Sequence, residues 1–260
     1  MSWAALHRGD HVQVADSPVE SARFGVSIAR VLVPEEAEAD AAFATVRETL
    51  SEHSADVIVL RYPARHVRWF ADLLSTGREL IHADTLDFWD RALDEVRDPD
   101  YAPYVLDESP SPEDVGAISA PMFDEYPNHY AANPRLDVSR LGAGFAEWAT
   151  TLAGAGPTGV LRAEDGDPAG YYTVALHGEV AEWVLGGVTA GHRGRGVYPR
   201  LMVGAERAAA QAGASRLIVS TQVQNLPVRR FYARLGMTPL SAFLTVHAVR
   251  SDRSDRSATR

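Results

Sequence analysis

Apolar and polar positions in the second half of the chain follow a regular succession of strand-like and helix-like patterns. Residues 171–176 and 179–189 are rich in β-branched and aromatic side chains and flank the turn at His177-Gly178, which predicts a hairpin. Further on, apolar residues recur at helical spacing until Gly213, which predicts a helix containing Leu201, Ala205, Ala208, Ala209 and Ala212.

A short strand over residues 217–220 and a second helix continue this pattern. Pro227 suits the first turn of that helix, and Gly236 is expected to end it. Its apolar residues lie at positions i, i+3, i+4 and i+7, namely Val228, Phe231, Tyr232 and Leu235. Residues 240–249 predict a last long strand or strand pair. The alternation of elements indicates an α/β (α+β) fold with a mixed sheet flanked by helices.

The first half of the chain contains a similar strand-helix-strand segment. A predicted strand over 57–60 is followed by Pro63 and then by a helix with the same apolar spacing, built from Val67, Phe70, Ala71 and Leu74. A predicted strand over 80–89 follows this helix. This copy has Ala71 where the later one has Tyr232, and no glycine-rich loop precedes its strand. We interpret it as a half-domain that packs but does not catalyse. The alternative is that any two such units look this similar.

Composition suggests how these segments are organised. Four prolines, Pro99, Pro103, Pro110 and Pro112, stand among acidic and serine residues, which favours a linker. We therefore expect an N-terminal half over 1–98, a linker over 99–112 and a catalytic domain over 113–250. Residues 251–260 have no apolar residue larger than alanine and are predicted to be a disordered tail.

Bulk properties exclude several classes of protein. The chain of 260 residues has no cysteine, which excludes disulfides, thiolate catalysis and cysteine-ligated zinc, and no metal site is predicted. A formal net charge of -10 argues against a nucleic-acid partner. No stretch approaches the roughly 18 apolar residues of a membrane span, and the first residues lack a secretory signal pattern. We expect a cytoplasmic enzyme.

The segment that most clearly indicates chemistry is the arginine- and glycine-rich loop between the predicted hairpin and helix. It contains Arg193, Gly194, Arg195 and Gly196, followed by Val197 and Tyr198. Glycines let backbone N–H groups approach an anion, and a helix N-terminus presents unpaired N–H groups to it. The arginines suit phosphate oxygens, so the loop predicts a diphosphate site. It is neither a P-loop nor a dinucleotide-binding motif. The alternative is a basic turn without a ligand.

Residues 193–198 resemble the Arg/Gln-x-x-Gly-x-Gly/Ala signature of the GNAT acetyltransferases, although Tyr198 replaces a small residue. Residues 225–237 resemble a second signature of the same family. The resemblance implies the GNAT fold and acetyl-CoA, or another acyl-CoA or acyl-pantetheine, as the donor substrate. It implies that Asn225 lies beside the pantetheine arm and that Tyr232 protonates the departing thiolate. From helical spacing alone, Tyr232 fits a core tyrosine equally well.

Amide formation from a thioester also needs a base and an oxyanion donor. Glu182, on the strand before the loop, is the first candidate for the base, with His177 and Glu179 as others. If the fold holds, a strand bulge should present a backbone N–H from the segment between Leu185 and Val188 to the oxyanion.

Residues 21–26, 128–137 and 241–247 resemble segments of the dTDP-fucosamine acetyltransferase type. That resemblance spans most of the chain, including a degenerate GNAT-like N-terminal half, and implies the 4-amino group of a nucleotide-linked deoxysugar as acceptor. His129, Tyr130 and Asn133 form a compact set of donors, acceptors and a ring suited to a hydroxylated ligand. The alternative is a capped turn with a buried tyrosine.

Three functions follow from these observations. The first is an acyl-CoA-dependent N-acyltransferase that acts directly on an amino sugar nucleotide or a similar small polar amine. The second takes its acyl group from an acyl carrier protein. The third is a CoA-binding regulatory module without catalysis. The expected partner is thus a small-molecule amine and, for the second function, an acyl carrier protein, with no nucleic acid and no membrane. A homodimer that covers a sheet edge is a further expectation.

Overall fold

The computed structural model describes residues 3–97, 100–124, 126 and 128–251. Its centre is one continuous sheet of ten strands in the order β1-β2-β3-β10-β4-β9-β8-β7-β6-β5. The strands are β1 (Gln13–Asp16), β2 (Ile28–Leu32), β3 (Val57–Pro63), β4 (Glu79–Ala92), β5 (Val105–Asp107), β6 (Thr158–Arg162), β7 (Pro168–His177), β8 (Val180–Val188), β9 (Arg216–Gln222) and β10 (Thr238–Val249).

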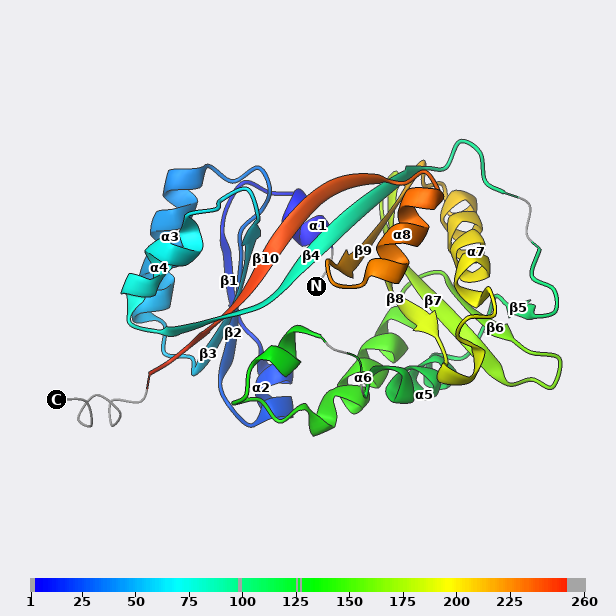
Figure 1. Cartoon of the computed structure of the whole chain (residues 1–260), viewed down its shortest axis with the longest axis horizontal. Coiled ribbons are helices and arrows are strands. Elements are labelled where there is room, and N and C mark those ends of the chain that lie inside the picture. The colour runs from blue at the N-terminus through cyan, green and yellow to red at the C-terminus, as the bar shows by residue number, and fades with distance from the viewer. Residues whose placement is uncertain (1–2, 98–99, 125, 127, 252–260) are drawn as a thin grey trace.

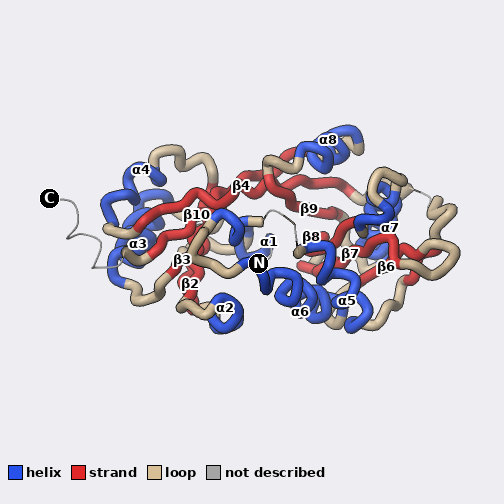
Figure 2. The backbone as a smooth tube through the Cα atoms, turned by 60° about the horizontal axis from the view of Figure 1, so that its bottom comes forward, coloured by secondary structure: helices blue, strands red, loops and turns tan. Residues whose placement is uncertain are grey.

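Helices cover both faces of this sheet, with α2, α5 and α6 on one side and α8 on the other (Figure 2). The helices are α1 (Trp3–His7), α2 (Pro18–Phe24), α3 (Ala39–Glu52), α4 (Trp69–Leu73), α5 (Pro112–Phe123), α6 (Leu141–Ala153), α7 (Val197–Gln211) and α8 (Leu226–Arg234). Short 3₁₀ turns are η1 (Leu74–Thr76), η2 (His129–Ala132), η3 (Val138–Arg140) and η4 (Ala190–His192). The mixed sheet flanked by helices confirms the predicted fold class.

The two halves of the chain repeat one arrangement and exchange a strand. The orders β2-α3-β3-α4-β4 and β8-α7-β9-α8-β10 match, and each contains one parallel pair, β2 with β3 and β8 with β9. However, β10 lies between β3 and β4, while β4 pairs with β9 (Figure 1). Because each half completes the other's sheet, the halves share one structural unit.

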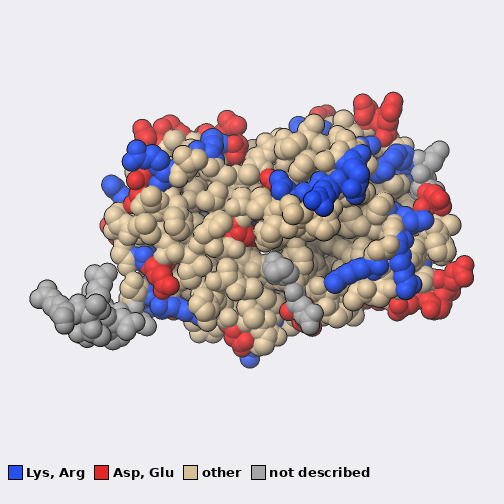
Figure 3. All heavy atoms as spheres, viewed as in Figure 1, with Lys and Arg blue, Asp and Glu red and all other residues tan. Residues whose placement is uncertain are grey.

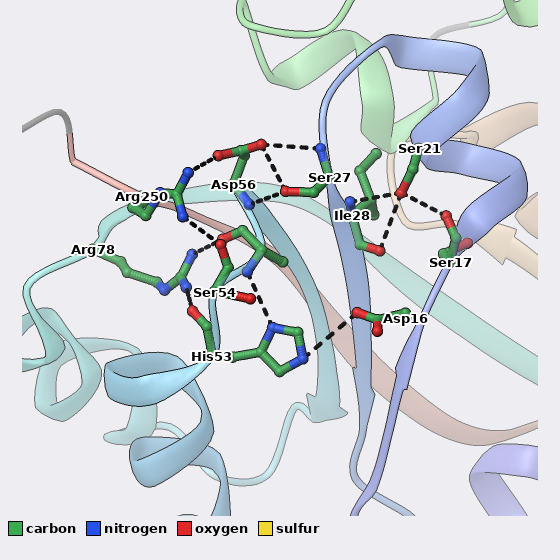
Figure 4. Close-up of polar contacts among 11 residues, drawn as sticks. Asp16, Ser17, Ser21, Ser27, Ile28, His53, Ser54, Asp56, Arg78 and Arg250 are labelled. Carbon is green, nitrogen blue, oxygen red and sulfur yellow. Dashed lines mark hydrogen bonds and ion pairs between the residues drawn. The ribbon is translucent and has the colours of Figure 1, made fainter.

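The end of β10 is fastened to the N-terminal half by a polar network (Figure 4). Arg250 donates to the carbonyl of Ser54 and the carboxylate of Asp56. Asp56 also accepts hydrogen bonds from the backbone and hydroxyl of Ser27. Arg78 donates to the carbonyls of Ala55, at 2.9 Å, and of Ala248 in β10, at 3.3 Å. These bonds fix the exchanged strand beside β3.

Several local predictions need correction. Residues 105–107 of the predicted linker form β5, which pairs with β6 at the edge of the sheet, and Pro112 begins α5 behind the N-cap Ser111. In α4 the buried residues are Trp69 and Leu73, whereas Val67 is 84% and Leu74 57% exposed. The face of α4 that packs on the core is therefore the one that carries Trp69 and Leu73, not the predicted face that carries Val67 and Leu74. Of the predicted tail, all but Ser251 lies outside the described residues.

Candidate active site

Strands β8 and β9 separate partway along their length. They pair in parallel from Val180 to Trp183, opposite Arg216 to Val219, and no pairing between them is formed beyond that point in the described sheet. On its other side β8 pairs with β7, but Trp183 lies opposite Val174 and Leu185 opposite Thr173, so Val184 is an unmatched bulge residue. The bulge thus falls one residue before the range 185–188 that was predicted to contain it.

A large cavity of about 1800 Å³ opens at this separation. One wall is formed by β8, from Glu182 to Val188, and another by β9, from Val219 to Gln222. Helices α5 and α6 and residues of the N-terminal half, including Arg30, Arg61 and Asp84, complete it. The cavity therefore joins the C-terminal half, with its glycine-rich loop, to the face of the sheet that the N-terminal half contributes.

The glycine-rich loop leads into a helix N-terminus that no side chain of the described residues caps. Gly194 (φ 76°) and Gly196 (φ 73°) both adopt left-handed backbone conformations, which favour glycine. Helix α7 has no side-chain cap and no acidic residue in its first turn. Figure 3 shows basic side chains gathered over α8 and over the loop before α7. Uncapped N–H groups beside arginines are suited to an anion such as a diphosphate.

Some of the residues predicted to bind acyl-CoA line the cavity, and others do not. Leu185, Val188, Arg193, Tyr198 and Asn225 line the cavity, together with Tyr232. The rest of the loop does not line it: Arg195 and both glycines are exposed, and Val197 is buried in the core beneath α7.

Arg200, in the first turn of α7, holds the loop in place. It donates to the carbonyls of Gly196, at 2.9 Å, and Ala102, at 2.5 Å. The amide of Leu185 is likewise engaged, since it donates to the hydroxyl of Thr173 at 3.2 Å. Val184, without a matched partner on either neighbouring strand, is therefore a better placed oxyanion donor than Leu185.

Tyr232 belongs to an aromatic cluster at the cavity wall. Its hydroxyl lies 2.8 Å from that of Tyr198, whose ring stacks on Trp183 at a centroid distance of 5.3 Å. Burial raises the pKa of Tyr232 well above its usual value, and the neighbouring Tyr198 acts in the same direction. Tyr232 is therefore a neutral hydroxyl that can donate a proton. Tyr198, the departure from the family pattern, is its hydrogen-bonding partner.

Glu182 and His177, two of the three residues considered for the base, are brought together. Glu182 is buried, and its Oε2 accepts a hydrogen bond from the backbone N–H of Trp3 at 2.8 Å and lies 3.3 Å from Nε2 of His177. Glu179 does not line the cavity, whereas Glu182 does. The contribution of α1 to this pair had no signal in the sequence.

The predicted acceptor residues His129, Tyr130 and Asn133 are tied into an internal network. His129 Nδ1 lies 2.9 Å from His247 Nε2, and Asn133 Nδ2 lies 3.2 Å from His247 Nδ1. The hydroxyl of Tyr130 donates to Glu20. His129 and Tyr130 line the cavity, but Asn133, which is 1% exposed, does not. Asn133 thus packs behind the cavity wall, which agrees with the alternative of a capped turn with a buried tyrosine.

The N-terminal half has the equivalent elements but no equivalent opening. Strand β2 is paired with β3 along its whole length, Ile28–Leu32. At the start of α3, the helix that corresponds to α7, Glu38 accepts hydrogen bonds from the N–H groups of Asp40 and Ala41, which lower its pKa. A carboxylate of the chain itself therefore accepts the hydrogen bonds of the N–H groups at the start of α3.

Comparison with known proteins bears on the C-terminal half directly. Residues 120–237 match the model of the family described as "Acetyltransferase (GNAT) family". This segment contains the separated strands, the loop and Tyr232 together. The C-terminal half of the chain has the GNAT fold.

Solved GNAT structures extend the similarity to the N-terminal half. A tandem GNAT protein from the clavulanic acid biosynthesis pathway is 17% identical, with 88% of this chain and 77% of that chain covered and a TM-score of 0.58. A GCN5-related N-acetyltransferase from Sphaerobacter thermophilus is 12% identical, with coverage of 93% and 77% and a TM-score of 0.59. Another from Kribbella flavida is 15% identical, with coverage of 88% and 84% and a TM-score of 0.57.

These likenesses establish the fold over nearly the whole chain. A search of curated proteins gave no match. Among the described residues, no helix has both the length and the apolar character needed to span a membrane.

Proposed function

We propose that the chain transfers an acyl group, in the first instance acetyl, from acyl-CoA directly to the amine of a small polar acceptor. The observation that carries this proposal is the cavity itself. It joins the uncapped loop at Arg193, the bulge at Val184 and the protonated hydroxyl of Tyr232, which are the three features that thioester aminolysis requires.

Different residues of the cavity have different roles in the transfer. Arg193 and the N–H groups at the start of α7 hold the diphosphate, and Asn225 lies along the pantetheine arm. When the acceptor nitrogen forms its bond to the acyl carbon, the N–H of Val184 stabilises the oxyanion. The C–S bond then breaks, Tyr232 gives its proton to the sulfur, and Glu182 receives the proton from nitrogen with His177 beside it.

The acceptor class rests on the size of the cavity and on sequence resemblance. A volume of about 1800 Å³ exceeds the roughly 300 to 1,000 Å³ of ordinary ligand pockets, and leaves room for an acceptor beside a pantetheine arm. The resemblance of residues 21–26, 128–137 and 241–247 to amino-sugar acetyltransferases makes an amino sugar nucleotide one acceptor of this class.

The experiment that tests the proposal is a transfer assay with the full chain, acetyl-CoA and a panel of amines that includes a dTDP-4-amino sugar. Release of CoA thiol is followed together with the mass of each amine. We expect at least one amine to gain an acetyl group in step with CoA release. Binding of acetyl-CoA without transfer to any amine would favour the regulatory module, and transfer only from an acyl-loaded carrier protein would favour that donor.

A further inference from the structure

Strands β8 and β9 stop pairing at a point where a serine stands on one side and the bulge residue on the other. Trp183 and Val219 are the last matched pair of the two strands, and Val184 and Ser220 are the residues that follow them. Both Val184 and Ser220 line the cavity. Because the strands run parallel, Ser220 lies across the opening from the N–H group that stabilises the oxyanion in the proposed function.

The side chain of Ser220 lies on the same face of the sheet as Glu182. Ile218, which lies opposite Glu182, belongs to a buried cluster that also contains side chains of α1, whereas Val219 belongs to the cluster that contains Tyr232. Successive side chains of a strand point to opposite faces, so Ser220 shares the face of Ile218 and Glu182. Ser220 and Tyr232 therefore approach the opening from opposite faces of the sheet.

This arrangement separates the departing sulfur from the incoming amine. In the proposed transfer Tyr232 protonates the sulfur on the face that α8 covers, and α5 and α6 lie on the other face (Figure 2). The cavity is bounded by α5, α6 and the N-terminal half. An amine that enters through the cavity therefore reaches the acyl carbon on the face that carries Ser220 and Glu182.

The hydroxyl of Ser220 has no hydrogen-bonding partner within the part of the chain that the structure describes, although the residue is half-buried. The two polar residues that follow it are both engaged: Thr221 accepts from Nδ2 of Asn225 at 3.1 Å, and Gln222 accepts from the hydroxyl of Tyr126. A serine hydroxyl can both accept and donate a hydrogen bond. At the end of β9, the hydroxyl of Ser220 is therefore left for a ligand.

Glu182 leaves a matching position open on the neighbouring strand. Its Oε2 accepts from the N–H of Trp3 and lies 3.3 Å from His177, but its Oε1 accepts no hydrogen bond from the described residues. Neighbouring strands are about 4.8 Å apart and two residues span about 6.6 Å, so the α-carbons of Glu182 and Ser220 are about 8 Å apart. Side chains that project from such positions leave room for an amino group between them.

From this geometry we propose that the Ser220 hydroxyl accepts a hydrogen bond from the attacking amine and orients it toward the acyl carbon, which makes Ser220 a further catalytic residue. This inference rests on the proposed acyltransferase function. The acceptor enters as an ammonium ion and loses one proton to Glu182, directly or through a water molecule. One remaining N–H bond points at Ser220, so the lone pair faces the acyl carbon and forms the C–N bond, while Ser220 keeps its own proton.

The test replaces Ser220 by two residues of nearly equal shape. Threonine keeps a hydroxyl and valine has a methyl group in its place, so Ser220→Thr and Ser220→Val separate the hydroxyl from the size of the side chain. Both residues suit a strand, and both variants should therefore fold. Ser241→Ala is the matched control, because Ser241 lies in the same row of the sheet, beyond Phe88, but its hydroxyl is bonded to His7 at 2.7 Å and it does not line the cavity.

Steady-state CoA release is measured with a dTDP-4-amino sugar, glucosamine and 2-aminoethanol, and binding of these acceptors to the CoA-saturated chain is measured by calorimetry. A hydrogen bond to a charged group corresponds to about 10- to 100-fold in affinity. For the best acceptor, kcat/KM of Ser220→Val should therefore be at least tenfold below that of Ser220→Thr, and Ser220→Thr and Ser241→Ala should stay within about fivefold of the wild type. The dissociation constant for acetyl-CoA and the melting temperature should be the same in Ser220→Thr and Ser220→Val.

The outcomes separate this inference from the function on which it rests. Equal kcat/KM in Ser220→Thr and Ser220→Val overturns the role of Ser220 and leaves the acyltransferase, and so does a loss in Ser220→Val that is confined to acetyl-CoA binding. Acceptor binding that depends on the hydroxyl, without transfer to any amine, refutes the acyltransferase and leaves Ser220 as an amine-binding residue. If the wild type neither binds nor acetylates any of the three acceptors, the inference is overturned, and the wider amine panel decides on the acyltransferase.

Discussion

Replacement of Tyr232 by phenylalanine removes one oxygen atom from the cavity wall and nothing else from the packing of α8. The lost hydroxyl lies 2.8 Å from that of Tyr198 and, with its pKa raised by burial, is protonated throughout the neutral range. If this group protonates the departing thiolate, Tyr232→Phe should lower kcat by about 10²- to 10⁴-fold, the usual contribution of a general acid. That range corresponds to about 3 to 5 kcal/mol in the activation barrier.

The same substitution should affect folding far less than it affects the rate. It leaves the Tyr198 hydroxyl without this partner, which costs about 1 to 3 kcal/mol of stability. Tyr171→Phe is the matched control: that tyrosine is equally buried, donates to Ser119 at 2.8 Å and does not line the cavity. Both variants should therefore lose similar stability, and only Tyr232→Phe should lose turnover.

The assay is steady-state CoA release with the best amine of the panel, accompanied by calorimetric titration with acetyl-CoA. The dissociation constant for acetyl-CoA should change less than about threefold, because the hydroxyl is assigned to the leaving sulfur in the transition state. A kcat for Tyr232→Phe within about threefold of that for Tyr171→Phe would refute the role of Tyr232 as the proton donor.

Three further predictions concern the glycine-rich loop, the buried Glu206 of α7 and stability at acid pH. Gly196→Ala places a side chain at a φ of 73°, so it should cost about 1 to 2 kcal/mol of stability and weaken acetyl-CoA binding at least tenfold by calorimetry; an unchanged affinity would contradict the anion site. Glu206→Gln should lower the free energy of unfolding in urea by about 3 kcal/mol, because Glu206 is fully buried and ion-pairs with Arg91 at 3.0 Å; a loss below about 1 kcal/mol would contradict this. Burial alone would raise the pKa of Glu20, but Arg30 outweighs it and lowers the pKa from 4.5 to about 2. The unfolded chain therefore takes up this proton first as pH falls, and about 3 kcal/mol of stability present above pH 4.5 should be lost toward pH 2; in Glu20→Gln this pH dependence should be absent from urea unfolding curves.

Local sequence signals predicted the C-terminal elements well. The hairpin of β7 and β8 turns at Gly178, where φ is 66°, and α8 ends before Gly236, where φ is 79°. Both features depend on which residues can adopt left-handed backbone, so short-range chemistry decides them. The bulge at Val184 lies one residue before the predicted range 185–188.

Features that depend on long-range pairing could not be predicted in this way. The exchange of β4 and β10 joins residues such as Asp84 and Thr245, which are far apart in the sequence, and no local pattern specifies that register. For the same reason no local pattern indicates that α1 covers Glu182 or that Asp84 faces the cavity. His129 and Tyr130 line the cavity, yet their hydrogen bonds are to other protein groups, and their predicted contact with the acceptor stays a prediction.

The most direct test of the central claim is one measurement on the full chain: acetyl-CoA and the amine panel are incubated together, and product mass and free CoA are determined at intervals. The cavity geometry predicts that at least one amine gains a single acetyl group in equal amount to the CoA released, and that Tyr232→Phe slows this at least a hundredfold. Free CoA that appears without any acetylated amine, or acetylation at the same rate in Tyr232→Phe, would contradict the proposed transfer at this site.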